Sequence, residues 1–392
     1  MSTQKNKLLF FVILAFFSTL TAFSIIYIVS RTASASGATD FHSYWYAGHF
    51  IRQRVDPYTA YVEQISPRLP IVYLDGQIVT ELPIAQPGLA RVPANTPLMV
   101  ELLSVFAFFS WPTAKFLWMF CNLAIALIIP FLTIRLFPQL RLSPIKNTIL
   151  LTLIFFSLFG TRNAIGNGQT SIFVFAMMLM AVSTNNIWLS SIALGIALSK
   201  YSLSLPAAIL LLLEKKYRVQ SHLAQPGIHI AATFPPTIGW SLIFLVSTLV
   251  AIALCKYFVR AKLNPYFLSR PLLRPILFNI LTLWILLTTY HRAYDTLVAL
   301  VFIALLIELL LNPNNLPKIH RTVLSVALLG ILAALILPKT VESIAPGINA
   351  ELTSAWQRWH NPFVTLSLLV ALLTSIWALY HPKIERIKDE NS

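Results

Sequence analysis

Long apolar runs recur along the whole chain, and they limit its possible folds more than any other feature. Many of them approach the roughly 20 residues of helix that cross the hydrocarbon core of a bilayer. Only 11% of the 392 residues are charged and 57% are hydrophobic, whereas a soluble domain carries about 25% charged residues. So few charges cannot cover a water-facing surface. The sequence therefore predicts an all-α polytopic membrane protein.

We expect about ten or eleven transmembrane helices, because several of the apolar runs are shorter than a full span and suit tilted pairs or half-helices. The candidate runs are rich in Leu, Ile and Phe, and they cover residues 8–29, 97–110, 113–137, 147–159, 171–183, 187–213, 237–259, 275–289, 296–311, 322–337 and 362–380. No internal repeat is visible. Residues 1–392 are therefore expected to form a single transmembrane domain.

The positions of the basic residues predict the orientation, because Lys and Arg collect on the cytoplasmic side. Lys5 and Lys7 precede the first run, which is too long for a signal peptide and is expected to be retained with a cytoplasmic amino end. The basic tail, residues 381–392, is expected in the cytoplasm, and residues 30–96 form a long first extracytoplasmic loop. Counting crossings leaves the topology of residues 148–236 open.

The net charge of +15 does not indicate nucleic-acid binding, because the basic residues lie between apolar runs and no RNA- or DNA-binding motif is present. Loops that face anionic lipid head groups explain the excess, so membrane lipids are the expected partners. The two cysteines, Cys121 and Cys255, lie inside apolar runs and rule out a disulfide framework or a cysteine metal cage.

Polar and aromatic side chains concentrate in the first loop, beginning with Asp40. Residues 40–54 have a helical period and predict a short helix at the membrane surface. A carboxylate at that boundary can accept a proton from a hydroxyl group. Asp40 can instead act as the N-cap of the helix, and the two roles are compatible. Further along, Asp56-Pro57-Tyr58 is typical of a turn, and Arg91 precedes the second run.

Three later features interrupt the apolar pattern. Gly166-Asn167-Gly168-Gln169 is a flexible turn that either binds a sugar or joins two helices, and it lacks the Lys-Ser or Lys-Thr of a phosphate loop. Lys200 lies near the middle of a long run, where a charge usually faces a cavity or a partner. A polar group of four residues lies between two spans as an interfacial loop or as part of a site: His291, Arg292, Tyr294 and Asp295.

These motifs, in this order, resemble glycosyltransferase family 87, the polyprenol-phosphate-mannose-dependent mannosyltransferase-like proteins of the GT-C fold. The resemblance covers residues 40–311 and is weakest at residues 219–275. Five segments carry it: Asp40 to Ala47 with Asp56-Pro57-Tyr58, Pro93 to Trp118, Gly168-Gln169, Leu194-Gly195 to Lys200 with Pro206 and the basic residues 215–218, and His291-x-x-Tyr294-Asp295.

The resemblance implies a GT-C bundle whose catalytic acid in the first loop corresponds to Asp40, with His291 as a second catalytic candidate. It implies a polyprenyl-phosphate sugar donor, most often carrying mannose, and a lipid or glycan acceptor. Transfer would invert the sugar at the periplasmic or outer face of the bacterial inner membrane, and no cofactor is expected. A metal site is not expected either, because the extracytoplasmic loops contain no HExxH pattern and no DxD pair. The substrate-binding candidates are His42, Tyr44, Asp56, Tyr58, Arg91, Gln169, Lys200, Arg292, Tyr294 and Asp295. Arg52, Arg91 and Arg292 are further candidates for stabilising the phosphate leaving group, from their charge and placement.

Two other functions remain open at this stage. A transporter or flippase of lipid-linked sugars would explain the spans and Lys200, although it would not need the long acidic and aromatic loop, and no repeat typical of transporters is visible. A non-catalytic membrane assembly subunit would use the same loop residues for structure only.

Overall fold

The computed structural model describes residues 2–35, 37–60, 72–74, 77–79, 96–137, 144–213, 250, 252–254, 257, 272–288, 293–311, 318–344 and 350–380. Within these ranges the chain is helical apart from a small antiparallel hairpin of β1 (Val72–Leu74) and β2 (Gln77–Val79). The predicted all-α class is confirmed for this part of the chain. The prediction for residues 237–259 falls almost wholly outside it, as does the tail, residues 381–392.

The amino-terminal part begins with the long helix α1 (Ser2–Ala33) and turns into α2 (Thr39–Arg52) and the one-turn helix α3 (Pro57–Ala60). The chain returns through α4 (Pro97–Leu103) and η3 (Ser104–Phe108) to the long helix α5 (Trp111–Ile134). Lys115 of α5 donates hydrogen bonds to the carbonyl oxygens of Ala33 and Ser34, at 3.4 and 3.1 Å. A cation at these free carbonyl groups stabilises the end of α1.

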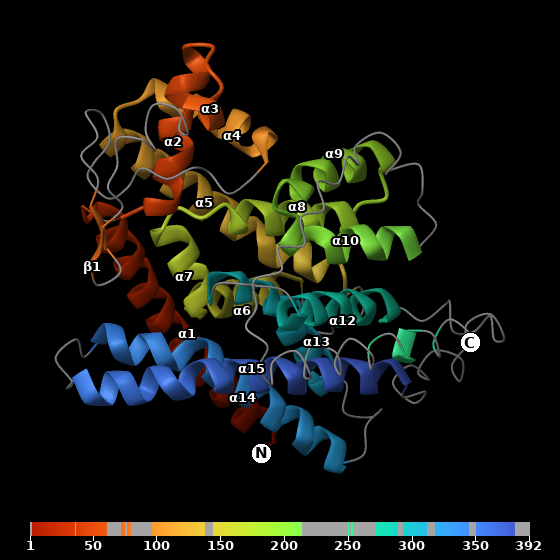
Figure 1. Cartoon of the computed structure of the whole chain (residues 1–392). Coiled ribbons are helices and arrows are strands. Elements are labelled where there is room, and N and C mark those ends of the chain that lie inside the picture. The colour runs from red at the N-terminus through yellow and green to blue at the C-terminus, as the bar shows by residue number, and fades with distance from the viewer. Residues whose placement is uncertain are drawn as a thin grey trace.

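The middle part contains α6 (Pro144–Ser157), α7 (Phe159–Gly166), α8 (Ser171–Ser183), α9 (Ile187–Ala197), η4 (Leu198–Lys200) and α10 (Tyr201–Leu213). A break at Leu158 bends α7 by 67° away from α6. The Asn186 side chain caps α9 by accepting hydrogen bonds from the amides of Trp188 and Leu189. Helix α8 packs against α5, α9 and α10 (Figure 1).

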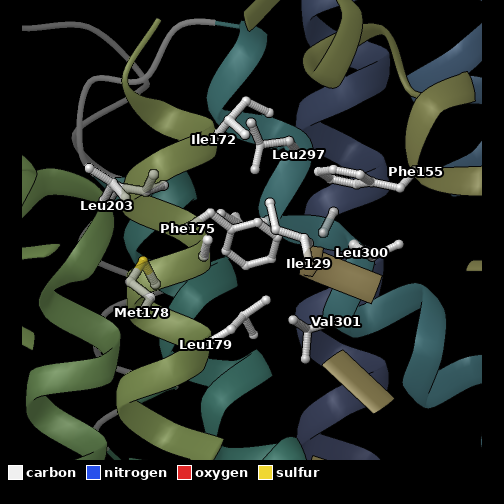
Figure 2. Packing of buried hydrophobic residues seen from close by; sticks show 14 of the residues in the cluster. Ile129, Phe155, Ile172, Phe175, Met178, Leu179, Leu203, Leu297, Leu300 and Val301 are labelled. Carbon is white, nitrogen blue, oxygen red and sulfur yellow. The ribbon is translucent and has the colours of Figure 1, made fainter. Parts of the chain in front are cut away.

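The carboxyl-terminal part contains α12 (Leu273–Thr288), η7 (Ala293–Ala299), α13 (Leu300–Leu311), α14 (Lys318–Ile344) and α15 (Ala350–Tyr380). Helices α14 and α15 lie side by side, and α15 also packs against α12 (Figure 1). Figure 2 shows the apolar centre where Phe175 of α8 meets Ile129 of α5, Leu203 of α10 and Leu300 of α13. This packing joins the elements that carry the polar site described below.

Two described helices are long and apolar enough to cross a membrane, at residues Phe10–Ala33 and Trp111–Ile134, and the bent pair α6–α7 would make a third. Both single helices expose large apolar side chains, among them Phe11 and Ile26 on α1 and Phe120 and Leu127 on α5. Apolar surface of this kind suits lipid rather than water. The other expected runs in the described part are also helical, but their apolar stretches are shorter than a full span, as in Arg321–Ile336 of α14 and Val364–Tyr380 of α15.

The span expected at residues 187–213 is wrong as one continuous helix, because α9 ends at Ala197 and η4 separates it from α10. The break puts Lys200 at the end of η4, where its side chain reaches partners on two other elements. The surface helix expected at residues 40–54 forms as α2, yet it is buried on all sides from Phe41 to Gly48. It packs against η3, α4 and α5 and so lies inside the protein.

Candidate functional site

A short polar stretch, residues 167–171, joins α7 to α8 and includes the first residue of α8. It brings together side chains and backbone from five other elements. We call it the 167–171 segment. Its residues are Asn167, Gly168, Gln169, Thr170 and Ser171. Arg31 of α1 donates from Nε to the Oδ1 atom of Asn167 at 3.2 Å. Trp118 of α5 donates from Nε1 to the carbonyl oxygen of Gly168 at 2.9 Å.

The start of α2 is attached to this segment through backbone hydrogen bonds. The amide of Ala38 donates to Gly166 and the amide of Asp40 to Asn167, both at 3.1 Å. Gly168 has a φ of 69°, and a Cβ at this position would lie 2.6 Å from the Cβ of Phe41. Only glycine fits this left-handed backbone and this close approach of two chain segments.

Asp40 meets Gln169 at this junction. The side-chain amide Nε2 of Gln169 donates a hydrogen bond to Oδ2 of the Asp40 carboxylate. Gln169 is buried and Asp40 is half-buried. The interpretation of Asp40 as an N-cap is wrong, because the cap is Ala38 in a left-handed conformation and Asp40 lies inside the first turn of α2. The amide therefore orients a carboxylate that remains partly accessible.

Tyr44 lies one helical turn after Asp40 and forms a hydrogen bond with the Thr170 side chain. Burial raises the pKa of Tyr44 well above its ordinary value, and the nearby Asp40 carboxylate adds to the effect. The Tyr44 hydroxyl is therefore neutral throughout the physiological range. It can donate a hydrogen bond near Asp40 without adding a second negative charge.

An ion pair lies at the other end of the 167–171 segment. Lys200 Nζ is 2.7 Å from Oδ1 of Asp295, and both groups hydrogen-bond to Ser171 Oγ, at 2.6 Å for Lys200 and 2.8 Å for Asp295. The two charged side chains are 12% and 5% exposed. This pair connects η4 and η7 to the start of α8, and it explains how a charge inside an apolar run is compensated.

Aromatic rings enclose the other side of α2. Phe41 stacks between Trp111 and Trp118, with ring centroids 6.0 and 5.3 Å away. His42 is fully buried, and its ring meets Trp111 edge-on at 4.7 Å and stacks on Tyr46. His42 thus packs inside this aromatic cluster. The packing holds α2 firmly, because the rings contribute large buried areas with specific geometry.

The remaining predicted site residues are placed as follows. Asp56 is exposed, and its Oδ1 atom accepts from the amide of Tyr58 at 3.1 Å, which is the turn that the Asp-Pro sequence predicted. Arg52 is held by η3, donating to the carbonyl of Ala107 at 2.8 Å. Tyr294 lies in η7, but only its backbone is described. Three candidates lie outside the described residues: Arg91, His291 and Arg292.

Sequence reasoning missed Ser171 and Arg162. Ser171 reads as the first residue of an apolar helix, and only its contact with two residues far along the chain reveals it. Arg162 follows an apolar run and resembles a loop residue, yet it is buried at 1% exposure. Within the described ranges, no group of three His, Cys, Asp or Glu side chains is placed to hold a metal ion.

The arrangement offers chemistry at two places along one segment. A half-buried carboxylate oriented by an amide can accept a proton from a bound hydroxyl group. A compensated lysine and aspartate can fix the segment or contact a polar ligand. No family model, no curated protein and no solved structure matches this chain.

Proposed function

We propose that this protein is a membrane glycosyltransferase that moves a monosaccharide from a polyprenyl-phosphate donor to a lipid or glycan acceptor. The protein would form a GT-C bundle of ten or eleven spans, transfer mannose, and carry its site on the side of a bacterial inner membrane that faces the periplasm or exterior. The donor's isoprenoid tail would stay in the bilayer while the protein contacts the phosphosugar at its edge.

One observation carries the proposal. Residues from separate motifs meet at the 167–171 segment: Asp40 contacts Gln169, Trp118 contacts Gly168, and Lys200 and Asp295 both contact Ser171. Asp40 and Asp295 are far apart in the chain. Burial of apolar surface does not explain why two acidic residues lie at the same segment. Polar and charged groups gathered inside an apolar bundle are typical of a functional site.

The chemistry follows from the carboxylate. Asp40 would take the proton of the acceptor hydroxyl as its oxygen attacks the anomeric carbon of the donor sugar. The bond between that carbon and the phosphate oxygen breaks, and the electron pair leaves with the lipid phosphate. A single displacement inverts the anomeric centre. Gln169 and Tyr44 would orient Asp40, and His291 and Arg292 remain candidates for the phosphate side because they precede Asp295 in sequence.

The test is transfer of radiolabelled sugar in membranes that contain the protein, using a small panel of polyprenyl-phosphate sugars. We expect product from one donor above the level of membranes without the protein. Folded protein that transfers sugar from none of these donors to cell-envelope acceptors would contradict the proposal. A His291→Ala variant in the same assay should lose turnover without losing extractable protein, and wild-type turnover would remove His291 from the site.

A second candidate function is transport or flipping of lipid-linked sugars. The buried Lys200–Asp295 pair supports it, because intramembrane charge pairs mark the pathways of many transporters. The two functions differ in proteoliposomes. A flippase would move a fluorescent lipid-linked sugar across the bilayer without forming a new glycosidic bond, and Asp40→Asn would leave that movement unchanged.

A further inference from the structure

Arg162, on the short helix α7, is a buried cation, and one edge of its guanidinium group has no hydrogen-bond acceptor in the part of the chain that the structure describes. Its side chain is 1% exposed, and its Nε and Nη2 atoms are buried without a hydrogen-bond partner. No carboxylate within the described residues pairs with it. Nε and Nη2 lie on the same edge of the guanidinium group, and this edge binds two oxygen atoms of a carboxylate or phosphate at once.

Aromatic rings surround the guanidinium group. Phe23 and Tyr27 of α1 and Phe159 of α7 each have a ring centroid 5.5 Å from its Cζ atom. Ring faces attract a cation, yet they accept no hydrogen bond in the plane of the guanidinium group. The aromatic contacts therefore compensate part of the charge and leave the donors of the Nε–Nη2 edge without acceptors, which is costly in an apolar interior.

Further donors are close to Arg162 in the chain. The hydroxyl of the neighbouring Thr161 is also buried without a partner. The break at Leu158 makes α7 a separate helix inside the bundle, so its first-turn amides lack intrahelical acceptors. Broken helices in membranes direct such amino ends at anionic groups. Guanidinium, hydroxyl and helix end thus all favour the same kind of ligand.

From this geometry we infer that the contact between α1 and α7 around Arg162 is an oxyanion site, and that its ligand is the phosphate group of a membrane lipid. Phosphate matches the Nε–Nη2 edge and the helix end together. The rings of Phe23, Tyr27 and Phe159 are each partly exposed, so they form the wall between Arg162 and the outer surface of α1. A ligand enters by displacing them.

A lipid is favoured over free phosphate by the surface next to this wall. Ile26 and Val29 on the same part of α1 are 65% and 42% exposed, and α1 is one of the two single helices of membrane-spanning length. An acyl or isoprenoid chain along this apolar face would bring its phosphate to the α1–α7 contact, where α1 and α7 lie side by side (Figure 1). A free anion gains nothing from that surface.

The position of Arg162 also suits the donor of the proposed glycosyltransferase, and this part of the inference rests on that proposed function. Arg162 is four residues, about 6 Å of helix, before Gly166 at the end of α7. The next residue, Asn167, accepts the Asp40 amide. A donor phosphate bound at Arg162 would then lie toward the amino end of this short helix and the Asp40 carboxylate at its carboxyl end, with the sugar between them.

Lipid binding tests the site without any sugar or acceptor. The full protein is placed in phosphatidylcholine nanodiscs, and retention of radiolabelled polyprenyl phosphate is compared with that of polyprenol of equal chain length. We expect the wild type to prefer the phosphate form by about tenfold or more. Arg162→Gln should abolish the preference, and Arg162→Lys should keep only part of it because an ammonium group lacks the planar fork. Arg135→Gln is the matched control, because Arg135 also stacks on a ring, that of Phe131.

If folded Arg162→Gln protein still preferred polyprenyl phosphate over polyprenol, the assignment of the oxyanion site to Arg162 would be wrong. Displacement of the lipid by millimolar inorganic phosphate would overturn the choice of a lipid ligand. Thermal unfolding distinguishes a structural role of Arg162 from a role in lipid binding. Without lipid, Arg162→Met should be at least as stable as wild type, and it should lose the rise in Tm that lipid causes in wild type. Unfolding of every Arg162 variant, Arg162→Lys included, would mean that the arginine is needed for packing and would contradict the inference. Lipid binding without transfer from any donor would leave the site intact and count only against the glycosyltransferase.

Discussion

Gln169 donates a hydrogen bond to the carboxylate of Asp40, although 129 residues separate them in the chain. The contact joins the first turn of α2 to the connection between α7 and α8. It gives Gln169 a positioning role, because the amide holds the Oδ2 oxygen of the Asp40 carboxylate in place.

Replacing Gln169 tests that role through the pH dependence of transfer. Gln169→Glu places a second carboxylate against Asp40, and two adjacent carboxylates resist ionising together. We expect the acid limb of the pH–rate profile to move to higher pH. Gln169→Leu removes the donor without adding charge, so kcat should fall several-fold with little movement of the limb. Identical profiles for wild type and both variants would show that Gln169 does not act on the base.

The close approach at Gly168 predicts a second effect. Gly168→Ala forces a side chain into a left-handed backbone 2.6 Å from the Cβ of Phe41, so α2 must shift. We expect a loss of about 2 kcal/mol or more in stability, since both strain and overlap contribute. Gly330→Ala in α14 is the control. Nothing lies within 4 Å of its added Cβ, and alanine should stabilise that helix by up to about 1 kcal/mol. The Tm values of Gly168→Ala and Gly330→Ala are compared with that of wild type in the same detergent.

The Lys200–Asp295 pair predicts strong coupling in a double-mutant cycle. Removing one partner leaves a buried charge and should cost about 3–5 kcal/mol of stability, whereas Lys200→Met with Asp295→Leu should cost much less than the sum. Denaturation of the four proteins in mixed micelles measures the coupling. Additive effects would show that the two side chains do not interact in the folded protein.

Tyr44 predicts a loss of stability in alkali. Burial raises its folded pKa above the unfolded value of 10.0. Above pH 10 the unfolded chain releases this proton while the folded protein keeps it, so stability falls as pH rises, by about 1.4 kcal/mol per pH unit for one group. Tyr44→Phe should reduce the slope of Tm between pH 9 and 11.5. Some slope should remain, because burial also raises the pKa of Tyr46 and Tyr58. An unchanged slope would contradict the burial of the hydroxyl.

The local sequence pattern predicted where helices form better than it predicted where they are interrupted. The run at residues 171–183 coincides with α8, because an apolar stretch between turn residues leaves few other choices. The break before Tyr201 carries no proline or glycine, and it coincides with the pairing of Lys200 with Asp295, 95 residues further along. Such tertiary pairing has no local signal. The number of spans stays a prediction for the same reason, since several described helices are shorter than the expected runs.

The candidate site was predicted in part. Asp40, Gln169, Lys200 and Asp295 stood out because polar groups in an apolar chain are rare, and the structure brings them to one segment. The proposed cap at Asp40 failed because the helix begins at Thr39, after a left-handed Ala38 that no residue pattern signals. Arg162 was missed because its burial depends on α1, far back in the chain.

The central claim is that Asp40 is the base for sugar transfer, and Asp40→Asn tests it most directly. The substitution keeps the size of the side chain and removes its ability to accept a proton. Transfer of radiolabelled sugar from the active polyprenyl-phosphate donor should fall by about 100-fold to 10,000-fold, with an unchanged Tm and unchanged donor binding. Near wild-type transfer by folded Asp40→Asn protein would contradict the account.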